Sequence, residues 1–377
     1  MKEKTIYFIA GEASADNHGA ALMRALREMN PNVVFRGRGG PQMKTIAGAE
    51  FDDWIADAAV IGLWEVVRSY QYFRRKFQET LADIARLNPD AVLLIDYPGF
   101  NLRLGRALRR QKFSRKIIYY ISPQVWAWNA GRIAQMARWI DLMLCIFPFE
   151  AELYNRSGLR TRFVGHPMID RLPSKKIVTA RDPNLIGLFP GSRIREIRAI
   201  FPILIDVMRR MRNRRPELRF EIAAASDELA NTMEKMFSSA RTADVNVQIK
   251  VTDAAGLMQR ATAGIVASGS ATLEAAYFRL PFVLIYKVAQ LTYIAAKIVV
   301  RVEYIGMPNL LAGKEIVPEF IQWRANADAI ITTLLSLIDD EAKRNQMIAE
   351  FDAIISQLGA GGGSQLAARE VFAELER

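Results

Sequence analysis

Two strand-to-helix junctions, each marked by a glycine, lie in the second half of this 377-residue chain. Residues 188–193 and 266–274 each follow an apolar run and open a helical pattern. A helix N-terminus presents unpaired backbone N–H groups and the positive end of the helix dipole, and Gly191 and Gly269 would let phosphates approach the backbone closely. Helix capping alone does not readily explain two such junctions in one half of the chain. Together they predict a nucleotide diphosphate site, with Arg193 standing where a metal ion would otherwise sit.

Strand and helix patterns alternate along both halves of the chain. The first half has strand patterns at 5–10, 33–36, 91–95, 117–121 and 142–146, with helical patterns at 15–28, 70–87 and 102–111. The alternation restarts after 173–176, with strands at 185–189, 220–224, 247–250, 264–267 and 282–285. Such alternation predicts right-handed βαβ units and parallel sheets. We therefore expect an α/β protein with two Rossmann-like domains, 1–172 and 173–364, around a cleft. Glycines in 358–364 precede a last helix, 365–377, which we expect to pack back on the first domain.

The chain is basic and has one cysteine. Lys and Arg outnumber Asp and Glu by 51 to 40, which favours a phosphorylated substrate, a lipid headgroup or a nucleic acid as partner. Basic runs at 103–116 and 209–215 have a simpler interpretation as solvated helix faces. Cys145 cannot form an intramolecular disulfide, and the N-terminus enters a strand pattern without a signal-peptide architecture, so we expect a cytoplasmic protein. No apolar stretch approaches the roughly 20 residues that a membrane-spanning helix needs.

The segment 60–76 combines apolar residues at helical spacing with cations that follow them. Leu63, Val67, Tyr70 and Phe73 would share one face, with Trp64 beside them. This pattern is typical of a helix that lies in a membrane interface. It is equally typical of an amphipathic helix that faces a protein core, and both interpretations stay open at this level.

Polar residues follow the first strand. Glu12, Ser14, Asp16 and His18 supply donors and acceptors that could bind a sugar or activate a hydroxyl. The alternative is that Ser14 and Asp16 cap the first helix, a position that their residue types favour.

Asp96 ends the apolar strand 91–95, just before Pro98 and Gly99 turn the chain. At the carboxyl end of a strand its carboxylate could take a proton from a hydroxyl that attacks an electrophilic carbon. The alternative is an Asx-turn that caps the next helix.

Residues 119–129 group aromatic side chains, with Arg132 beyond them. They could stack on a sugar or hold an acyl chain. Aromatic residues this dense are more often part of a core.

Further polar residues accompany the two junctions of the second half. Glu274 lies about one turn inside the helix that follows Gly269, so its carboxylate could accept both ribose hydroxyls of a nucleotide; it could also serve helix capping. The loop 305–322 adds Asn309 and Gln322. No Asp-x-Asp triplet occurs in the chain, so the usual sequence cue for a metal-dependent sugar transferase is missing.

An ordered set of motifs resembles those of the lipid-A-disaccharide synthase family, whose members are inverting glycosyltransferases of the GT-B fold. The resemblance runs from end to end. It rests on Gly11-Glu-Ala-Ser-Ala-Asp16, Asp96-Tyr-Pro-Gly-Phe-Asn101, Ser122-Pro-Gln-Val-Trp-Ala-Trp128, Phe147-Pro-Phe-Glu150, Gly165-His-Pro167, Leu188-Phe-Pro-Gly-Ser-Arg193, Ala267-Ser-Gly-Ser-Ala-Thr-Leu-Glu274 and Pro308-Asn-Leu-Leu-Ala-Gly313.

The resemblance implies transfer of 2,3-diacylglucosamine from its UDP donor to the 6-hydroxyl of 2,3-diacylglucosamine 1-phosphate (lipid X), giving a β-1,6 disaccharide and UDP. It implies no cofactor, no metal and no nucleic acid, peripheral binding to the cytoplasmic face of the inner membrane, and a homodimer as one expected state. Asp96 resembles the general base, and we place Glu12 and His18 with it. The residues expected to bind substrate or UDP are Ser14, Asn101, Arg132, Ser192, Arg193, Glu196, Ser268, Gly269, Ser270, Thr272, Glu274, Tyr286, Asn309 and Gln322; those expected to face the membrane are Leu63, Trp64, Val67, Tyr70 and Phe73.

Two positions depart from the family pattern, and other functions compete. Ala15 replaces a common glycine, and Gly99 stands where some relatives carry a second aspartate, so we expect Asp96 to act without a neighbouring carboxylate. A nucleotide-sugar epimerase would keep the UDP junctions but needs no acylated acceptor. An RNA-binding protein would explain the charge, yet no recognised basic-aromatic module is visible. A nicotinamide dehydrogenase lacks its Gly-x-Gly-x-x-Gly after the first strand.

Overall fold

The computed structural model describes residues 3–55, 66–127, 131–240, 245–251, 253–290, 293–294 and 302–377, and only the backbone of 66–70. The chain forms two compact units, Met1–Asp170 with Leu358–Arg377, and Arg171–Gln357. Residues 358–364, expected in the second domain, thus belong to the first unit. The reason is local: the N–H of His166 donates to the Leu358 carbonyl (2.8 Å), and Asp170 accepts the N–H groups of Gly362 (2.6 Å) and Gly363 (3.0 Å).

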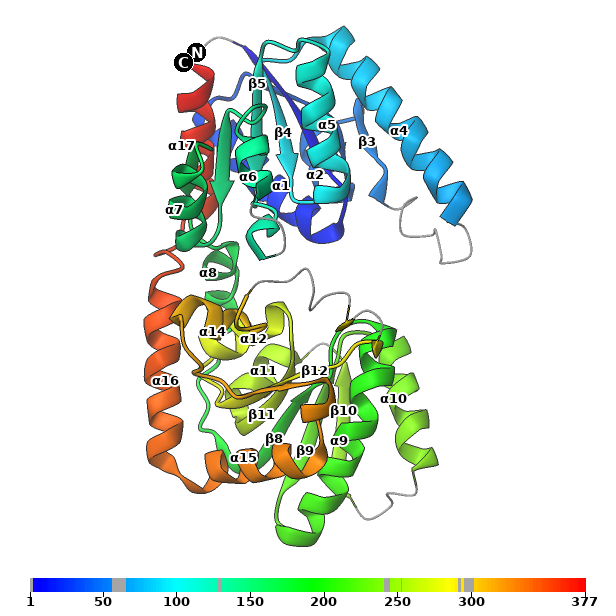
Figure 1. Ribbon diagram of the computed structural model, residues 1–377, viewed down its shortest axis with the longest axis vertical. Helices are drawn as coiled ribbons and strands as arrows, with labels where there is room; N and C mark the ends of the chain where they lie inside the picture. The colour runs from blue at the N-terminus through cyan, green and yellow to red at the C-terminus, as the bar shows by residue number, and fades with distance from the viewer. Residues whose placement is uncertain are drawn as a thin grey trace. The chain divides into compact units, whose positions relative to one another are not determined.

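The first unit is built on a parallel sheet with the order β3-β2-β1-β4-β5-β6-β7 (Figure 1). Its strands are rich in buried apolar residues, as expected for a parallel sheet covered on both faces. Pairing sets Ala10 opposite Ile95, and Ile95 opposite Tyr120, so three neighbouring strands end in line. The strands are β1 Lys4–Ala10, β2 Val33–Gly39, β3 Phe51–Asp53, β4 Ala91–Ile95, β5 Lys116–Tyr120, β6 Leu142–Cys145 and β7 Thr161–Phe163.

Helices cover both faces of this sheet. Phe8 and Phe35 pack edge to face on one side, with α1 and α17, whereas Trp54 and Leu94 belong to the core on the other side, with α4 and α5. Buried Ala367, Val371 and Phe372 of α17 complete the first of these cores, so the end of the chain is part of this unit. The helices are α1 Ala13–Met29, α2 Pro41–Ala47, α4 Val66–Leu87, α5 Pro98–Arg110, η2 Val125–Ala127, α6 Gly131–Met136, α7 Pro148–Arg156, α8 Pro167–Arg171 and α17 Gly363–Leu375.

One buried carboxylate ties α17 to the sheet. Glu374 is 2% exposed and forms ion pairs with Lys116 (3.0 Å) and Arg160. We expect Glu374→Gln to lower the free energy of unfolding by about 1–3 kcal/mol, because it leaves two half-buried cations without their anion; the partial exposure of both cations limits the loss. The measurement is the urea midpoint at a common m value. Glu370→Gln on the same helix, whose pair with Arg162 spans 3.7 Å near the surface, should change it by less than about 0.5 kcal/mol. Equal effects of the two variants would contradict this account.

The second unit is built on a parallel sheet with the order β10-β9-β8-β11-β12-β13 (Figure 1). Its strands are β8 Asp182–Phe189, β9 Arg219–Ala224, β10 Val247–Val251, β11 Ala261–Ala267, β12 Phe282–Tyr286 and β13 Glu319–Ile321. Its helices are η3 Pro173–Lys175, α9 Ile194–Arg214, α10 Asp227–Ser239, α11 Ala254–Arg260, α12 Ser270–Tyr277, α14 Met307–Ala312, η4 Gln322–Arg324, α15 Ala327–Asp339 and α16 Glu341–Ser356.

The predicted α/β architecture with two parallel sheets is confirmed. Every strand expected from the alternation is present, although some begin earlier, as β8 does at Asp182. Three strands were not expected: β3, β7 and β13. Each has three residues and lies at a sheet edge, so it is too short to produce an alternating pattern. Within the described ranges, no helix is long and apolar enough to cross a bilayer.

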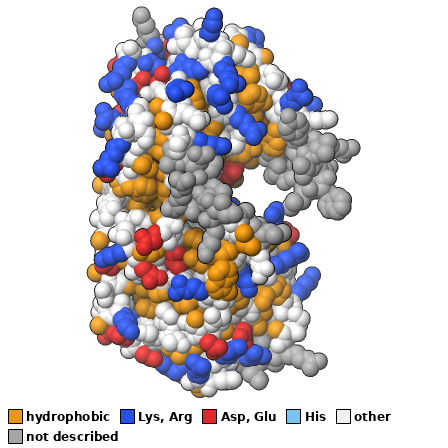
Figure 2. All heavy atoms as spheres, viewed as in Figure 1, with side chains coloured by type: hydrophobic (Ala, Val, Ile, Leu, Met, Phe, Trp, Pro, Cys, Tyr) orange, Lys and Arg blue, Asp and Glu red, His pale blue; other side chains and the backbone are white. Residues whose placement is uncertain are grey.

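The basic residues are spread over the visible surface (Figure 2). In the run 209–215 they form ion pairs: Arg209 and Arg210 with Asp206, and Arg215 with Glu217 and Asp339. The interpretation of this run as a solvated helix face is therefore confirmed. Such exposed pairs contribute little to stability.

Candidate active site

In the first unit, the turns that follow β1, β4 and β5 lie at one edge of the sheet, because these strands are neighbours and end in register. Glu12 follows β1, Asp96 follows β4, and Ser122 comes shortly after β5. Ligands of open α/β sheets bind at this carboxyl edge. The structure therefore brings the loops of Glu12 and Asp96, two of the predicted site residues, to the same edge of the sheet.

Asp96 and Tyr97 both adopt left-handed backbone conformations, with φ of 45° and 48°. Such conformations are rare for residues other than glycine and concentrate at functional sites. The surrounding structure holds this turn. The Asn101 amide donates to the carbonyls of Ile95 (3.1 Å) and Asp96 (2.8 Å), and the Tyr119 hydroxyl donates to the Asp96 carbonyl (2.5 Å). These bonds fix the backbone of Asp96, whose side chain is half-buried.

The environment of Asp96 raises the pKa of its carboxyl group. Burial is the main cause and the negative charge of Glu12 the second, while a hydrogen bond from the Tyr97 backbone opposes both. Glu12 is thus the neighbouring carboxylate, and the expectation that Asp96 lacks one is wrong. Gly99 provides no second carboxylate near Asp96. The negative charge comes instead from Glu12, which follows β1. A carboxylate with a raised pKa is a better proton acceptor, as a general base requires.

We expect Glu12→Gln to lower the pKa of Asp96, because the substitution removes a negative charge that disfavours ionisation. If ionised Asp96 is the base, the acid limb of the kcat/KM profile moves to lower pH. The measurement is this profile for both proteins. An acid limb that stays in place would mean that another group titrates. The control is Asp53→Asn, which changes an acid at the end of β3 in the same unit and should leave the limb unchanged.

The other polar residues after β1 have different surroundings. Asp16 is buried and accepts the N–H groups of Gly40, Gln42 and Met43 at 3.0 Å each, so it caps α2 and not its own helix. Ser14 is exposed in the first turn of α1, where Glu12 is the N-cap residue, and His18 is half-buried one turn later. The interpretation of Ser14 and Asp16 as caps of the first helix is therefore wrong. Sequence spacing could not reveal a contact between α1 and α2.

The aromatic loop after β5 is anchored by Glu150 of α7. Trp126 is half-buried, and its indole N–H donates to the Glu150 carboxylate (2.9 Å), while the Tyr154 hydroxyl donates to the Pro123 carbonyl (2.6 Å). Burial raises the pKa of Glu150 to about 7. Trp128 lies outside the described residues, and Arg132 is exposed on α6. Glu150 was not among the expected site residues, although it belongs to a quoted motif; its burial is a tertiary property.

The raised pKa of Glu150 predicts a pH dependence of stability. An acid whose pKa is higher in the folded than in the unfolded protein stabilises the fold only while protonated, so its contribution is present below the unfolded pKa of 4.5 and is lost as the pH rises through about 7. We expect Glu150→Gln to flatten the decline in stability between these values. The measurement is the urea midpoint of both proteins across this range. Parallel pH curves would contradict the assignment.

In the second unit, the junctions β8–α9 and β11–α12 lie side by side. Strands β8 and β11 are neighbours, with Phe189 opposite Val266, so both loops leave the same edge of the sheet. Gly191 and Gly269 have φ of 111° and 148°, which only glycine adopts readily. A Cβ added at Gly269 would meet no atom within 4 Å, so this loop is open to a ligand. The paired arrangement that the sequence suggested is present in the fold.

The first of these loops carries an arginine and a carboxylate. Arg193 is the N-cap residue of α9, its side chain is 80% exposed, and its guanidinium lies 3.1 Å from a Glu196 oxygen. The other Glu196 oxygen accepts the N–H of Ser192 (3.0 Å). Glu196 therefore bonds to both groups that the sequence assigned to a diphosphate. A bound anion would share or replace these contacts.

In the second loop, Ser268 is half-buried and Ser270 is exposed, whereas Thr272 is fully buried and donates to the Gly269 carbonyl (2.7 Å). Glu274 is half-buried and paired with Arg171. The Arg171 guanidinium donates to one Glu274 oxygen. Contact of this carboxylate with both ribose hydroxyls stays a prediction.

Two more of the expected residues hold backbone segments. Asn309 is buried and bonds to the backbone of Ile316 and Val317 and to Glu319, and Gln322 bonds to both backbone groups of Val288. Thr272 and Asn101 are buried as well and also bond to backbone carbonyls. All four residues therefore hold loops in this fold, and their direct contact with a ligand stays a prediction. Tyr286 is half-buried at the end of β12.

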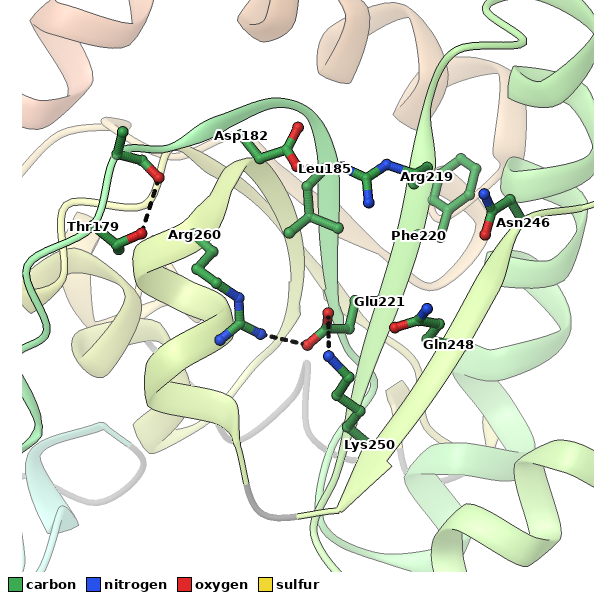
Figure 3. Close-up of a pocket in the computed structure, with 11 residues that line it drawn as sticks. Thr179, Asp182, Leu185, Arg219, Phe220, Glu221, Asn246, Gln248, Lys250 and Arg260 are labelled. Atoms are coloured by element: carbon green, nitrogen blue, oxygen red, sulfur yellow. Dashed lines mark hydrogen bonds and ion pairs between the residues drawn. The ribbon is translucent and has the colours of Figure 1, made fainter.

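A polar pocket of about 330 Å³ lies at the other edge of this sheet, near the starts of β8, β9 and β10 (Figure 3). Its buried acid, Glu221, is already bonded to Lys250 (3.0 Å) and Arg260 (2.6 Å). The pocket is therefore separate from the glycine junctions. Within the described ranges, no group of three or more His, Cys, Asp or Glu side chains could hold a metal ion.

The segment expected to face a membrane is described only in part. Leu63 and Trp64 lie outside the described residues, as do the side chains of Val67 and Tyr70. Phe73 is half-buried and packs edge to face on Trp54, with ring centroids 6.2 Å apart. Phe73 therefore contacts the core of the first unit.

Comparison with known proteins places the chain in a family. The sequence profile of the family described as lipid-A-disaccharide synthetase matches residues 6–367. The lipid-A-disaccharide synthase of Geobacter sulfurreducens is 38% identical over 97% of this chain and 96% of its own length, and that of Syntrophus aciditrophicus is 34% identical over 98% and 97%. Among solved structures, Neisseria meningitidis UDP-GlcNAc 2-epimerase bound to UDP-GlcNAc has a TM-score of 0.63 at 14% identity, covering 99% of this chain and 100% of that one. Acinetobacter baumannii MurG has a TM-score of 0.59 at 13% identity with the same coverages. These structures share the GT-B fold, and by its sequence the chain belongs to the lipid-A-disaccharide synthase family.

Proposed function

We propose that this protein is an inverting glycosyltransferase that joins 2,3-diacylglucosamine from UDP-2,3-diacylglucosamine to the 6-hydroxyl of 2,3-diacylglucosamine 1-phosphate. Family membership over nearly the whole chain supports the reaction. The observation that supports this chemistry is that one chain carries two features. Asp96, after β4, is a carboxylate with a raised pKa, and two adjacent glycine junctions follow β8 and β11.

The proposed mechanism is a single displacement at the anomeric carbon. Asp96 accepts the proton of the acceptor hydroxyl as its oxygen bonds to that carbon, and the bond from the carbon to the UDP oxygen breaks through an oxocarbenium-like state. The leaving diphosphate is stabilised by backbone N–H groups at the N-termini of α9 and α12 and by Arg193. Attack opposite to the leaving group inverts the configuration and yields the β-1,6 disaccharide.

We also propose that the enzyme acts on the cytoplasmic face of the inner membrane without spanning it, and that it can form homodimers. Both acylated substrates favour a membrane surface, and the net charge of +11 would attract the chain to anionic lipid headgroups. The apolar set Leu63, Trp64, Val67, Tyr70 and Phe73 is the proposed membrane-facing region.

The test is UDP release from UDP-2,3-diacylglucosamine in detergent micelles, with and without the 1-phosphate acceptor. We expect release that requires the acceptor and persists in the presence of a chelator. Release without acceptor would indicate a hydrolase. Conversion of a UDP-sugar to its epimer, with no UDP released, would instead support the epimerase alternative.

A further inference from the structure

An apolar groove of about 460 Å³ lies between α4 and α5 in the first unit. We call it the α4–α5 groove. Aromatic rings form its lining: Phe77 meets Phe100 edge to face at 5.4 Å, and Tyr97 stacks on Phe100 at 6.1 Å. Buried Trp54 packs against Phe100, with ring centroids 5.1 Å apart. The groove is lined by Phe73, Arg74, Phe77, Tyr97, Gly99, Phe100 and Arg103.

The groove begins at the candidate base. Tyr97 lines it and is the residue after Asp96. The Tyr97 ring also lies against Gly11, where an added Cβ would be 2.3 Å from the ring, so the groove adjoins the loop of Glu12 as well. One end of the groove therefore adjoins the two loops that carry Asp96 and Glu12.

Two arginines border the otherwise apolar lining. Arg74 and Arg103 are exposed, and neither has a carboxylate partner in the described part of the chain. The basic residues that follow Arg74 on α4 differ from it: Arg75 pairs with Glu79, and Lys76 pairs with Asp52 and Glu79. An apolar groove with unpaired guanidinium groups at its rim is complementary to an acyl chain attached to an anionic group.

We infer that the α4–α5 groove binds one acyl chain of the acceptor, with Arg74 and Arg103 binding the acceptor phosphate. This inference rests on the proposed function, since it assigns the groove to the substrate whose hydroxyl Asp96 deprotonates. Chain binding there fixes the sugar beside Asp96 and makes the groove selective for chain length.

Gly99 offers a direct way to fill the groove. A Cβ added there would meet no atom within 4 Å, and Gly99 occupies the first turn of α5, where a side chain causes no backbone strain. Gly99→Leu should therefore occupy the groove without disturbing the fold. An acyl chain in a micelle is already in an apolar medium, so its transfer to the groove would gain little. The kinetics therefore need short-chain acceptors that stay monomeric in water, with the same donor throughout.

For the native enzyme we expect kcat/KM to rise about fourfold for each methylene added to the acceptor, until the groove is full. In Gly99→Leu this dependence should disappear, while the shortest acceptor is used as by the native enzyme. Arg74→Ala and Arg103→Ala should each raise KM roughly tenfold for the phosphorylated acceptor and leave a dephosphorylated one unchanged. Arg75→Ala is the matched control and should have no such effect. An equal loss for all acceptors in Gly99→Leu, or native kinetics that ignore chain length, would overturn the inference.

Photolabelling separates failure of the inference from failure of the proposed function. A short-chain glucosamine 1-phosphate lipid with a diazirine in its acyl chain should label residues 97–103 in the native protein and not in Gly99→Leu. Labelling there supports the groove even if no UDP is released with any acceptor, in which case the proposed reaction is wrong. Labelling elsewhere, or labelling that Gly99→Leu does not reduce, overturns the groove assignment whether or not transfer occurs.

Discussion

Asp96→Asn is expected to lower kcat about 10³-fold while the protein still binds UDP, because a general base contributes about 10²–10⁴ to the rate and the proposed UDP site lies in the other unit. Asn tolerates the left-handed conformation that residue 96 adopts, with φ of 45°, and has nearly the same shape as Asp. The backbone bonds from Asn101 and Tyr119 to residue 96 do not involve its carboxylate and should persist. The loss would therefore report the missing proton acceptor. The measurement is steady-state UDP release together with UDP affinity.

The pH profile provides the control for Asp96. Glu12→Gln changes the pKa of Asp96 but keeps the base, so it should shift the acid limb and retain most of the activity. Asp96→Asn should remove that limb from whatever activity remains. A decrease of less than tenfold in Asp96→Asn, or an acid limb that survives it, would assign the base to another residue, with Glu12 the first candidate.

Arg193→Ala is expected to lower kcat about 10²–10³-fold, since removing one electrostatic stabiliser of a developing charge costs that much in other enzymes. Its side chain is exposed at the N-terminus of α9, where it can reach a diphosphate at the Gly191 loop. We expect weaker inhibition by the product UDP as well. Arg193→Lys should restore only part of the rate, because an ammonium group cannot donate two parallel hydrogen bonds to a phosphate.

Arg198→Ala serves as the matched control for Arg193. Arg198 lies on the same helix and is exposed, but it follows the first turn, so its loss should leave kcat and UDP affinity nearly unchanged. If the two variants lose activity equally, the effect comes from the general positive charge of α9 and not from a contact with the leaving group. If neither changes kcat, the diphosphate is stabilised by backbone N–H groups alone.

The sequence alone determined the fold class and the two glycine junctions, because both depend on local patterns. Alternating apolar strands and amphipathic helices require parallel sheets, and Gly191 and Gly269 mark the loops where only glycine fits the backbone, with φ of 111° and 148°. The position of Asp96 at a strand end was visible for the same reason: an apolar run stops at a charged residue.

Tertiary structure decided which polar residues work together, because that depends on contacts between elements far apart in the chain. Glu12 perturbs Asp96 only because β1 and β4 are neighbours in the sheet, and Asp16 caps α2 only because α1 packs against it. Burial, which no local pattern reports, placed Asn101, Thr272, Asn309 and Gln322 where they hold loops, and it raised the pKa of Glu150. Pairwise contact and desolvation are properties of the packed chain, and they set the electrostatics of the site.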